Sequence, residues 1–316
     1  METRRLEAFV KVVDLGSVTS AAKVLNVAQP ALSQQIASLE AEFKRQLLVR
    51  STRGVMPTEA GRTLYRYAKS IQRQIDEARR SVLDSEQELS GNVTIGLAPL
   101  SSATLFGPPL LTQLRRRHPG IILHIFDSFG VTLSELMLKG SMDIAILYGD
   151  RSVRGLDYKP LVMEEFYLVA PRDIFSSELW AQDIRPEELA KIDLMLPSRE
   201  SFLRQAIERV CAEVGERLRI VAEIQSRSTL SSAMMAGVGA TVLPKTVAQA
   251  LPNFEQLGLR RIDSHAASLQ MSLCISDYAR LSDAAFAVYN ILLETIALFK
   301  DDMMSHSMDP EAFLAE

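Results

Sequence analysis

The apolar positions of the first forty residues predict three short helices. In the first helix they recur at i, i+3, i+4 and i+7, at Leu6, Phe9, Val10 and Val13, and Gly16 ends the pattern. Ser17 offers an N-cap for a second helix that runs to about residue 25. Residues 26–28 form a turn, and Pro30 stands in the first turn of a third helix, where its missing N–H costs nothing. Two helices joined by so short a turn predict a helix-turn-helix.

The third helix, in the segment QPALSQQIASLE, has an unusual outer face. Leu32, Ile36 and Leu39 form one apolar stripe. The opposite side carries small or amide residues and almost no charge, namely Pro30, Ser33, Gln34, Ala37 and Ser38. A solvated helix face usually carries Lys and Glu, whereas a helix in the major groove of DNA needs short hydrogen-bonding side chains that reach base edges. The pattern predicts a DNA-reading helix, with a polar face packed against another protein as the alternative.

The pattern after residue 42 predicts a hairpin and then one long helix. Two short apolar runs, 47–49 and 55–56, flank the turn STRG, so a small wing is expected, with Arg50 and Arg53 near its tip. The head then spans 1–58, and Thr58 caps a linker helix expected at 59–89. An apolar heptad seam runs along this helix, at Leu64, Ala68, Ile71, Ile75, Ala78, Val82 and Leu89. The helix would span on the order of 45 Å, too long for the head to bury. The seam therefore predicts dimerisation, with packing on the chain's own body as the alternative.

Beyond residue 90, strand-like runs alternate with amphipathic helical segments. The runs are VTIGLA, IILHIF, DIAILYG, FYLVAP, LMLP, IVAEI, ATVLP and LQMSLCI. This alternation predicts an α/β body at 90–302, built largely on parallel strands. Two passes between subdomains are expected at 157–165 and 263–268, so that a second lobe, roughly 163–266, is inserted in the first. Residues 303–316 are expected to form a flexible tail.

Composition is that of an ordinary globular protein, with 47% hydrophobic and 23% charged residues. No apolar run approaches the roughly 20 residues of a membrane span, and the N-terminus lacks a signal-peptide core, so a cytoplasmic protein is expected. The net charge of −4 conceals an asymmetry. Residues 1–62 hold nine Lys/Arg against six Asp/Glu, whereas residues 90–316 hold 21 against 28. A mildly basic head on an acidic body indicates a nucleic-acid partner for the head.

Polar residues follow three of the predicted strands at the point where each strand ends. They are Ser101 and Ser102, then Ser128, Phe129 and Gly130, and on the other lobe Pro197, Ser198 and Phe202. Ligands of open α/β sheets bind at this edge. A helix starting at Ser101 would offer free N–H groups to an anion; the alternative is that both serines only cap that helix. The sequence has no Ser/His/Asp trio, carboxylate pair or metal-ligand spacing in a recognisable setting. Neither an enzyme nor a cofactor is predicted, and Cys211 and Cys274 are expected to be buried, reduced thiols.

The whole chain resembles the LysR-type transcriptional regulators of bacteria. The resemblance rests on AAKVLNVAQPALSQQIASLE, on the wing VRSTRGVMPTEAG and on the body that starts at GNVTIGLAP. Within the family, LLVRSTRGVMPTEAG and LSGNVTIGLAP are similar to the nitrogen assimilation control branch. One position departs from the family pattern: Ala28 stands where Ser usually precedes the Gln-Pro pair. This departure removes an N-cap worth about 1 kcal/mol, and Ala28 is therefore not assigned to DNA.

The resemblance implies a winged helix-turn-helix, a linker helix and a two-lobed effector domain like that of periplasmic solute-binding proteins. It implies a homodimer, assembling to a tetramer, that regulates transcription on double-stranded promoter DNA. The implied DNA-binding residues are Thr19, Gln29, Pro30, Ala31, Ser33, Gln34, Arg50 and Arg53. It also implies a small effector, a carboxylate or similar anion, between the three strand ends. If the branch is right, no effector need bind and control lies in protein abundance. Two rival classes of protein remain, a solute-binding protein without regulation and an enzyme of the α/β body.

Overall fold

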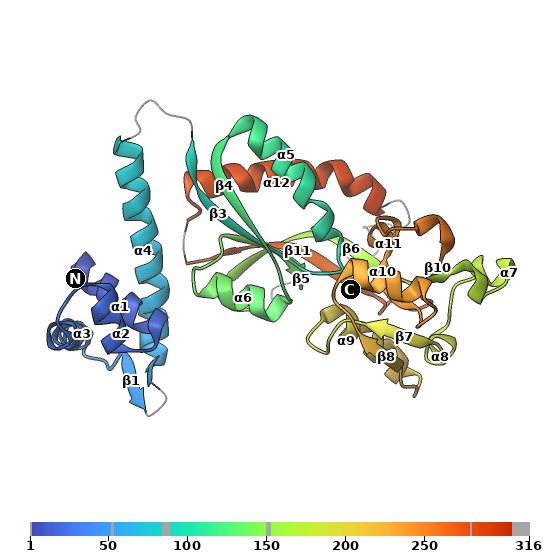
Figure 1. Ribbon diagram of the computed structural model, residues 1–316, viewed down its shortest axis with the longest axis horizontal. Coiled ribbons are helices and arrows are strands. Elements are labelled where there is room, and N and C mark those ends of the chain that lie inside the picture. The colour runs from blue at the N-terminus through green and yellow to red at the C-terminus, as the bar shows by residue number, and fades with distance from the viewer. Residues whose placement is uncertain (1, 52–53, 84–88, 150–152, 279, 305–316) are drawn as a thin grey trace, which may run out of the picture.

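The computed structural model describes residues 2–51, 54–83, 89–149, 153–278 and 280–304. A small head, blue in Figure 1, packs against the lower part of a long helix that stands beside a larger α/β body. The elements of the head and the long helix are α1 (Thr3–Leu15), α2 (Val18–Val24), α3 (Gln29–Phe43), β1 (Leu48–Ser51), β2 (Gly54–Pro57) and α4 (Glu59–Leu83). This order agrees with the predicted winged helix-turn-helix and long helix. Arg53 and the linker residues 84–88 lie outside the described residues.

Local signals set the ends of the helices in the head. Gly16 takes a left-handed conformation after α1, with φ of 59°. Ser17 caps α2 by accepting a hydrogen bond of 3.2 Å from the backbone N–H of Ser20. Thr58 caps α4 in the same way, with 3.0 Å from the Gly61 nitrogen to its Oγ1. Ala28 stands at the N-cap of α3 and makes no side-chain cap bond, so α3 relies on Pro30 and on tertiary packing.

The predicted dimer seam of α4 is partly used inside the chain. Leu64 and Ala68 are buried in the core of the head, and Ile71 packs against that core. Leu89 packs against the core of the body. The prediction that the whole seam faces a partner helix was therefore wrong at both ends. An apolar stripe with helical spacing fits a core contact as well as a helix pair, and the spacing alone does not distinguish them.

The middle of the seam is not covered by the head. Ile75 is half-buried and Ala78 is exposed. Val82 lies further along α4, near its described end. Ile75 and Ala78 are therefore open to a partner.

The body consists of two lobes joined by two strands. The first lobe contains β3 (Ser90–Leu97), α5 (Gly107–Arg117), β4 (Gly120–Asp127), α6 (Gly130–Leu138), β5 (Ile144–Tyr148) and α12 (Asp283–Met304). The second lobe contains α7 (Ser177–Trp180), α8 (Pro186–Leu189), β7 (Asp193–Leu196), α9 (Phe202–Glu213), β8 (Arg219–Glu223), α10 (Arg227–Met235), β9 (Thr241–Pro244), α11 (Lys245–Gln249) and β10 (Leu257–Arg261). The connecting strands are β6 (Leu156–Pro171) and β11 (Ser268–Ser276), which run antiparallel. From residue 305 on, the predicted tail lies outside the described residues.

The sheet of the body is mixed. Its order is β10-β6-β11-β5-β3-β4, and β9 also pairs with β6. Parallel pairing joins β3 to β4 and to β5, and in a separate two-stranded sheet β7 pairs in parallel with β8. The pairs of β6 with β9, β10 and β11, and of β11 with β5, are antiparallel. The prediction of a largely parallel sheet was wrong because the strands that cross between the lobes run against their neighbours.

One strand, β10, has no counterpart among the predicted strand-like runs. Its residues LGLRR include a glycine and two arginines, which are uncommon inside strands. Gly258 is required because a Cβ there would lie 2.6 Å from the ring of Trp180. Arg260 is 4% exposed and donates to the carbonyl oxygens of Gln182 and Asp183, at 3.0 and 3.1 Å. Both residues are explained by tertiary neighbours rather than by the local pattern.

The described part of the chain has no helix long and apolar enough to cross a membrane. Within the same residues, no group of three His, Cys, Asp or Glu side chains could hold a metal ion. Cys211 and Cys274 are free and buried, as predicted. Burial raises the pKa of Cys211 to about 11.

Candidate nucleic-acid interface and effector cleft

The outer face of α3 is open to solvent. Leu32, Ile36 and Leu39 are 0–3% exposed and hold the helix in the head. On the other side, Gln29, Pro30, Ala31 and Gln34 are exposed, and Ser33 is half-buried. Because the buried stripe anchors one face of α3, the opposite face carries amides and small side chains outward. Such a face can enter a major groove and pair with base edges.

The wing is attached to α3 by a carboxylate that sequence reasoning missed. One oxygen of Glu40, Oε1, accepts from the backbone nitrogens of Leu47 and Leu48, at 2.8 and 3.1 Å. These N–H groups belong to the segment that enters β1, so Glu40 fixes the wing beside the C-terminal part of α3. A Glu near the end of a helix gives no local indication of this role, because its partners are seven and eight residues ahead.

The other predicted DNA-binding residues of the head are open to solvent. Thr19, in α2, is exposed, and so is Arg50, on β1. Arg50 lies opposite Val55 in the β1–β2 ladder. Thr19 and Arg50 are thus accessible to a partner of the head.

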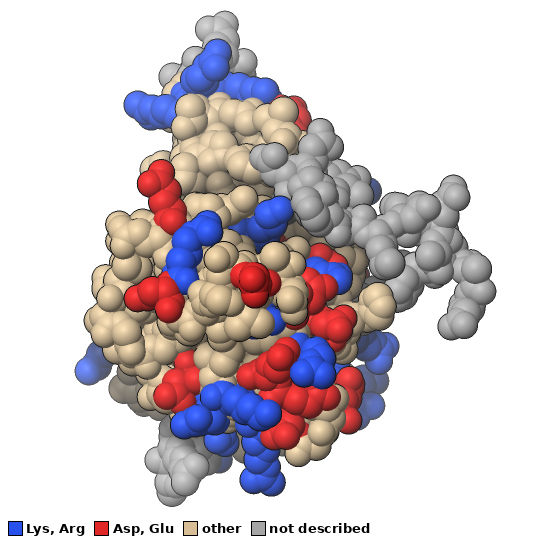
Figure 2. Space-filling view, turned by 90° about the vertical axis from the view of Figure 1, so that its right-hand side faces the viewer, with Lys and Arg blue, Asp and Glu red and all other residues tan. Residues whose placement is uncertain are grey.

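The end of the body shown in Figure 2 has a different character. Red and blue side chains alternate over this face, so that neither sign dominates it. The second lobe also contains ion pairs of opposite charges, among them Arg261 with Asp183 and Arg219 with Asp193. A face of mixed sign does not attract a polyanion.

The predicted effector residues come from both lobes, and two of them meet. A Cβ added to Gly130, at the start of α6, would lie 2.5 Å from the ring of Phe202, at the start of α9. The start of α6 in the first lobe and the start of α9 in the second lobe are therefore in contact. Ser128 and Phe129 precede Gly130 and are half-buried.

Ser101 and Ser102 are engaged by the protein itself. The Ser101 hydroxyl donates to the Ala98 carbonyl oxygen at 2.7 Å and accepts from the Ala103 nitrogen at 3.2 Å. Ser101 caps a 3-10 helix of only four residues (Ser102–Leu105), and α5 begins at Gly107. The helix that starts here is thus one turn of 3-10 helix, and its Ser102 N–H is donated to Glu164 of the chain itself, at 3.1 Å. The alternative, in which a serine caps the turn, describes Ser101.

On the second lobe, one predicted effector residue has a polar group without such partners. In the described residues no hydrogen-bond partner reaches the hydroxyl of Ser198, whose oxygen is buried. Pro197, the residue before it, uses its carbonyl oxygen to accept from Arg204 at 3.1 Å. Burial raises the pKa of Asp127 in the first lobe, and the charge of Arg227 in the second lobe lowers it. Asp127 and Arg227 thus interact between the lobes.

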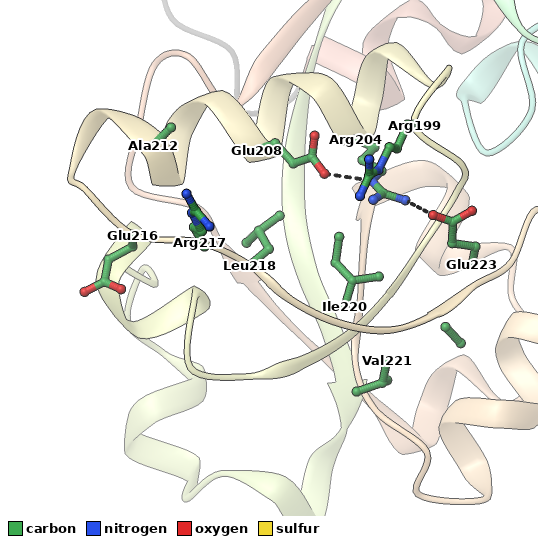
Figure 3. Close-up of a pocket in the computed structure, with 11 residues that line it drawn as sticks. Arg199, Arg204, Glu208, Ala212, Glu216, Arg217, Leu218, Ile220, Val221 and Glu223 are labelled. Atoms are coloured by element: carbon green, nitrogen blue, oxygen red, sulfur yellow. Dashed lines mark hydrogen bonds and ion pairs between the residues drawn. The ribbon is translucent and has the colours of Figure 1, made fainter.

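A pocket of about 660 Å³ lies on the outer side of the second lobe, between α9 and β8 (Figure 3). Arg204 is 2% exposed and donates to Glu208 and Glu223, at 2.8 and 2.5 Å. Ile220 and Val221 of β8 lie in the same pocket. Arg199 and Arg217 line the pocket as well, so it is a groove of mixed charge beside an exposed strand.

A winged helix-turn-helix joined by a long helix to a two-lobed α/β body is the architecture of a DNA-binding regulator of transcription. Two family models match the chain: "Bacterial regulatory helix-turn-helix protein, lysR family" over residues 3–62 and "LysR substrate binding domain" over residues 86–297. The chain therefore belongs to the LysR family of bacterial transcriptional regulators. Its body is the effector-binding domain of that family.

Curated relatives agree with this assignment. The chain is 40% identical over 297 residues to the nitrogen assimilation regulatory protein nac of Klebsiella aerogenes, a match that covers 94% of this chain and 96% of that protein. It is 37% identical to the nac protein of Escherichia coli K12 over the same shares. Both relatives are named as regulators and not as enzymes. These matches confirm the predicted similarity to the nitrogen assimilation control branch.

Solved structures share the fold. A full-length OxyR variant of Pseudomonas aeruginosa matches with a TM-score of 0.69 and 23% identity, over 94% of this chain and 95% of that one. Full-length BenM matches with a TM-score of 0.56 and 23% identity, over 98% and 100% of the two chains.

Proposed function

We propose that this regulator recognises an operator in double-stranded promoter DNA by inserting α3 into the major groove. The exposed amide and small-residue face of α3 carries this proposal, because short hydrogen-bonding side chains are what base readout requires. Gln29, Ser33 and Gln34 contact bases, and Thr19 and Arg50 contact phosphates. A bacterial DNA partner implies that the protein works in the cytoplasm.

Replacing Gln34 by Ala tests the base contact. Gln34→Ala should weaken binding to the specific operator by about 1–3 kcal/mol, or roughly 5- to 150-fold, and leave binding to random DNA almost unchanged. The measurement is a titration of both DNAs at several salt concentrations. Arg50→Ala is the matched control, because losing a phosphate contact weakens both DNAs alike and lowers the salt slope by about one. Equal losses on both DNAs for Gln34→Ala would exclude the base contact.

Two copies are proposed to dimerise through the middle and upper part of α4. The half-buried Ile75 and the exposed Ala78 support this, because they continue the apolar stripe past the region that the head covers. A palindromic operator needs two heads, and a twofold helix pair would supply them.

A second contact between copies is proposed at two sheet edges of the body. The first lobe ends at β4, where Ile122 and Phe126 are 60% and 45% exposed. The second lobe ends at β8, where Val221 is 47% exposed beside the groove of Figure 3. Unpaired apolar edges favour pairing with another chain. If the first lobe of each copy packed against the second lobe of another copy, these contacts would join two dimers into a tetramer.

We also infer that the cleft between the lobes admits a small anion. The unpartnered hydroxyl of Ser198 and the cation of Arg227 support this, since both belong to the second-lobe side of the cleft. A ligand held by both lobes would bias the angle between them and so the spacing of the heads.

Screening small mono- and dicarboxylates by thermal shift tests the cleft. A compound that binds should raise the melting temperature of the wild type. Ser198→Ala should bind the same compound roughly 2- to 10-fold more weakly, because one neutral hydrogen bond is lost. DNA affinity without the compound should not change. Ser177→Ala, on the exposed helix α7, is the control. The proposal fails if no carboxylate shifts the wild type, or if Ser198→Ala responds like Ser177→Ala.

A further inference from the structure

The carboxyl group of Glu164 lies inside the body where β6 passes from the first lobe to the second. Glu164 is 5% exposed and is the one acidic side chain in the described core. Its Oε1 accepts from the backbone nitrogen of Ser102 at 3.1 Å, and its Oε2 accepts from the hydroxyl of Tyr148. Both donors belong to the first lobe, at the carboxyl ends of β3 and β5.

The same hydrogen-bond network reaches the second lobe. The hydroxyl of Ser102 lies 2.5 Å from the Oγ1 of Thr246, in α11. Ser101, Ser102 and Tyr148 are 0%, 1% and 4% exposed. One carboxyl group from the connecting strand is thus held by donors of the first lobe, which are in turn bonded to the second lobe.

This is the place at which an exogenous carboxylate would be expected. Open α/β sheets bind ligands beyond the carboxyl ends of their strands, and Ser102 follows β3 at that edge. Glu164 already uses the Ser102 nitrogen and the Tyr148 hydroxyl, while the Ser101 hydroxyl is satisfied within its own turn. A second carboxylate would have to compete with Glu164 for these two donors and would meet a like group.

The two hydrogen-bond donors also explain why the protein can bury this acidic side chain. Burial raises the pKa of Glu164, while the hydrogen bonds from Ser102 and Tyr148 lower it. Enclosing a carboxyl group without such donors is strongly unfavourable, so the donors and the acid depend on each other.

We propose that Glu164 is a ligand built into the chain, whose carboxyl group fills a carboxylate-binding site formed by Ser102 and Tyr148 and linked to Thr246. In the wild type this site is closed to added carboxylates. Removing the side chain converts it into a binding site for a small free monocarboxylate. The proposal rests on the effector-binding role of the body and deepens it: the anion that the cleft recognises at this edge is supplied by the protein.

Chemical rescue of Glu164→Ala tests the proposal, because acetate matches the atoms that this substitution removes. Glu164→Ala should melt below the wild type. Sodium acetate should raise its melting temperature by about 2 °C or more over sodium chloride at equal ionic strength, with a saturable dependence on concentration. The rise in the wild type should be smaller, and neutral acetamide should do less than acetate. If Glu164→Ala does not stay folded, its refolding yield from urea in acetate and in chloride is the measurement.

Glu165→Ala is the matched control, since it truncates the neighbouring half-buried acid, which points to the other side of β6. It should gain no more from acetate than the wild type. Tyr148→Phe in the Glu164→Ala background should reduce the acetate response, because one donor is lost. The proposal is overturned if acetate neither stabilises nor refolds Glu164→Ala, or if it stabilises Glu165→Ala equally. A failure here, with a compound bound through Ser198, would leave the proposed function standing.

Discussion

Ile75→Glu is expected to split the protein into monomers and to reduce operator binding by about 100- to 10,000-fold. Ile75 lies on α4 beyond the residues that pack into the head, so the substitution leaves the core of the head intact. In a helix pair it would place two carboxylates in an apolar contact, where neither has a partner. A monomer would then bind only one half of the palindrome. It would lose the second head, which in the dimer is held at a high effective concentration beside the other half-site. Light scattering gives the mass, and an operator titration gives the affinity.

Gln74→Glu is the matched control for this prediction. It adds the same charge one residue away, at an exposed position outside the seam, and should leave dimers and binding unchanged. Val221→Asp separates the two contacts between copies, because a charge on the edge of β8 should abolish tetramers and preserve dimers. Retention of dimers by Ile75→Glu would show that α4 packs against something other than a second α4.

The second large effect is expected at Glu40, which attaches the wing to α3. Glu40→Ala should lower the free energy of unfolding of the head by about 2–3 kcal/mol, because two hydrogen bonds to a charged acceptor are lost and the Leu47 and Leu48 N–H groups are left unpaired. The wing then loses its orientation, so affinity for operator and random DNA should fall together. Urea unfolding measures the first effect, and DNA titration measures the second.

Glu40→Gln separates hydrogen bonding from charge. Its side-chain oxygen can still accept from both nitrogens, so it should retain most of the stability that Glu40→Ala loses. If the heads of Glu40→Ala and of the wild type unfold at the same urea concentration, the wing is held by its apolar contacts alone.

Residues close together in the sequence determined the DNA-binding head almost completely. The helix ends depend on Gly16, Ser17 and Pro30, and each acts on backbone groups within a few residues of itself. The outer face of α3 follows from the spacing of Leu32 and Ile36, because helix geometry places residues four apart on one side. The chain also carries enough motif residues to indicate its family.

Only the tertiary structure decided how distant segments meet. Strand-like runs show where strands lie but not which neighbours they pair with, and hence the antiparallel pairing of β6 and β11 was not predictable from alternation. The apolar seam of α4 could not distinguish a core contact at Leu64 from a partner helix. Glu164 meets Ser102 across 62 residues of chain. A buried acid is stable only where the fold brings donors to it, and no local pattern records that encounter.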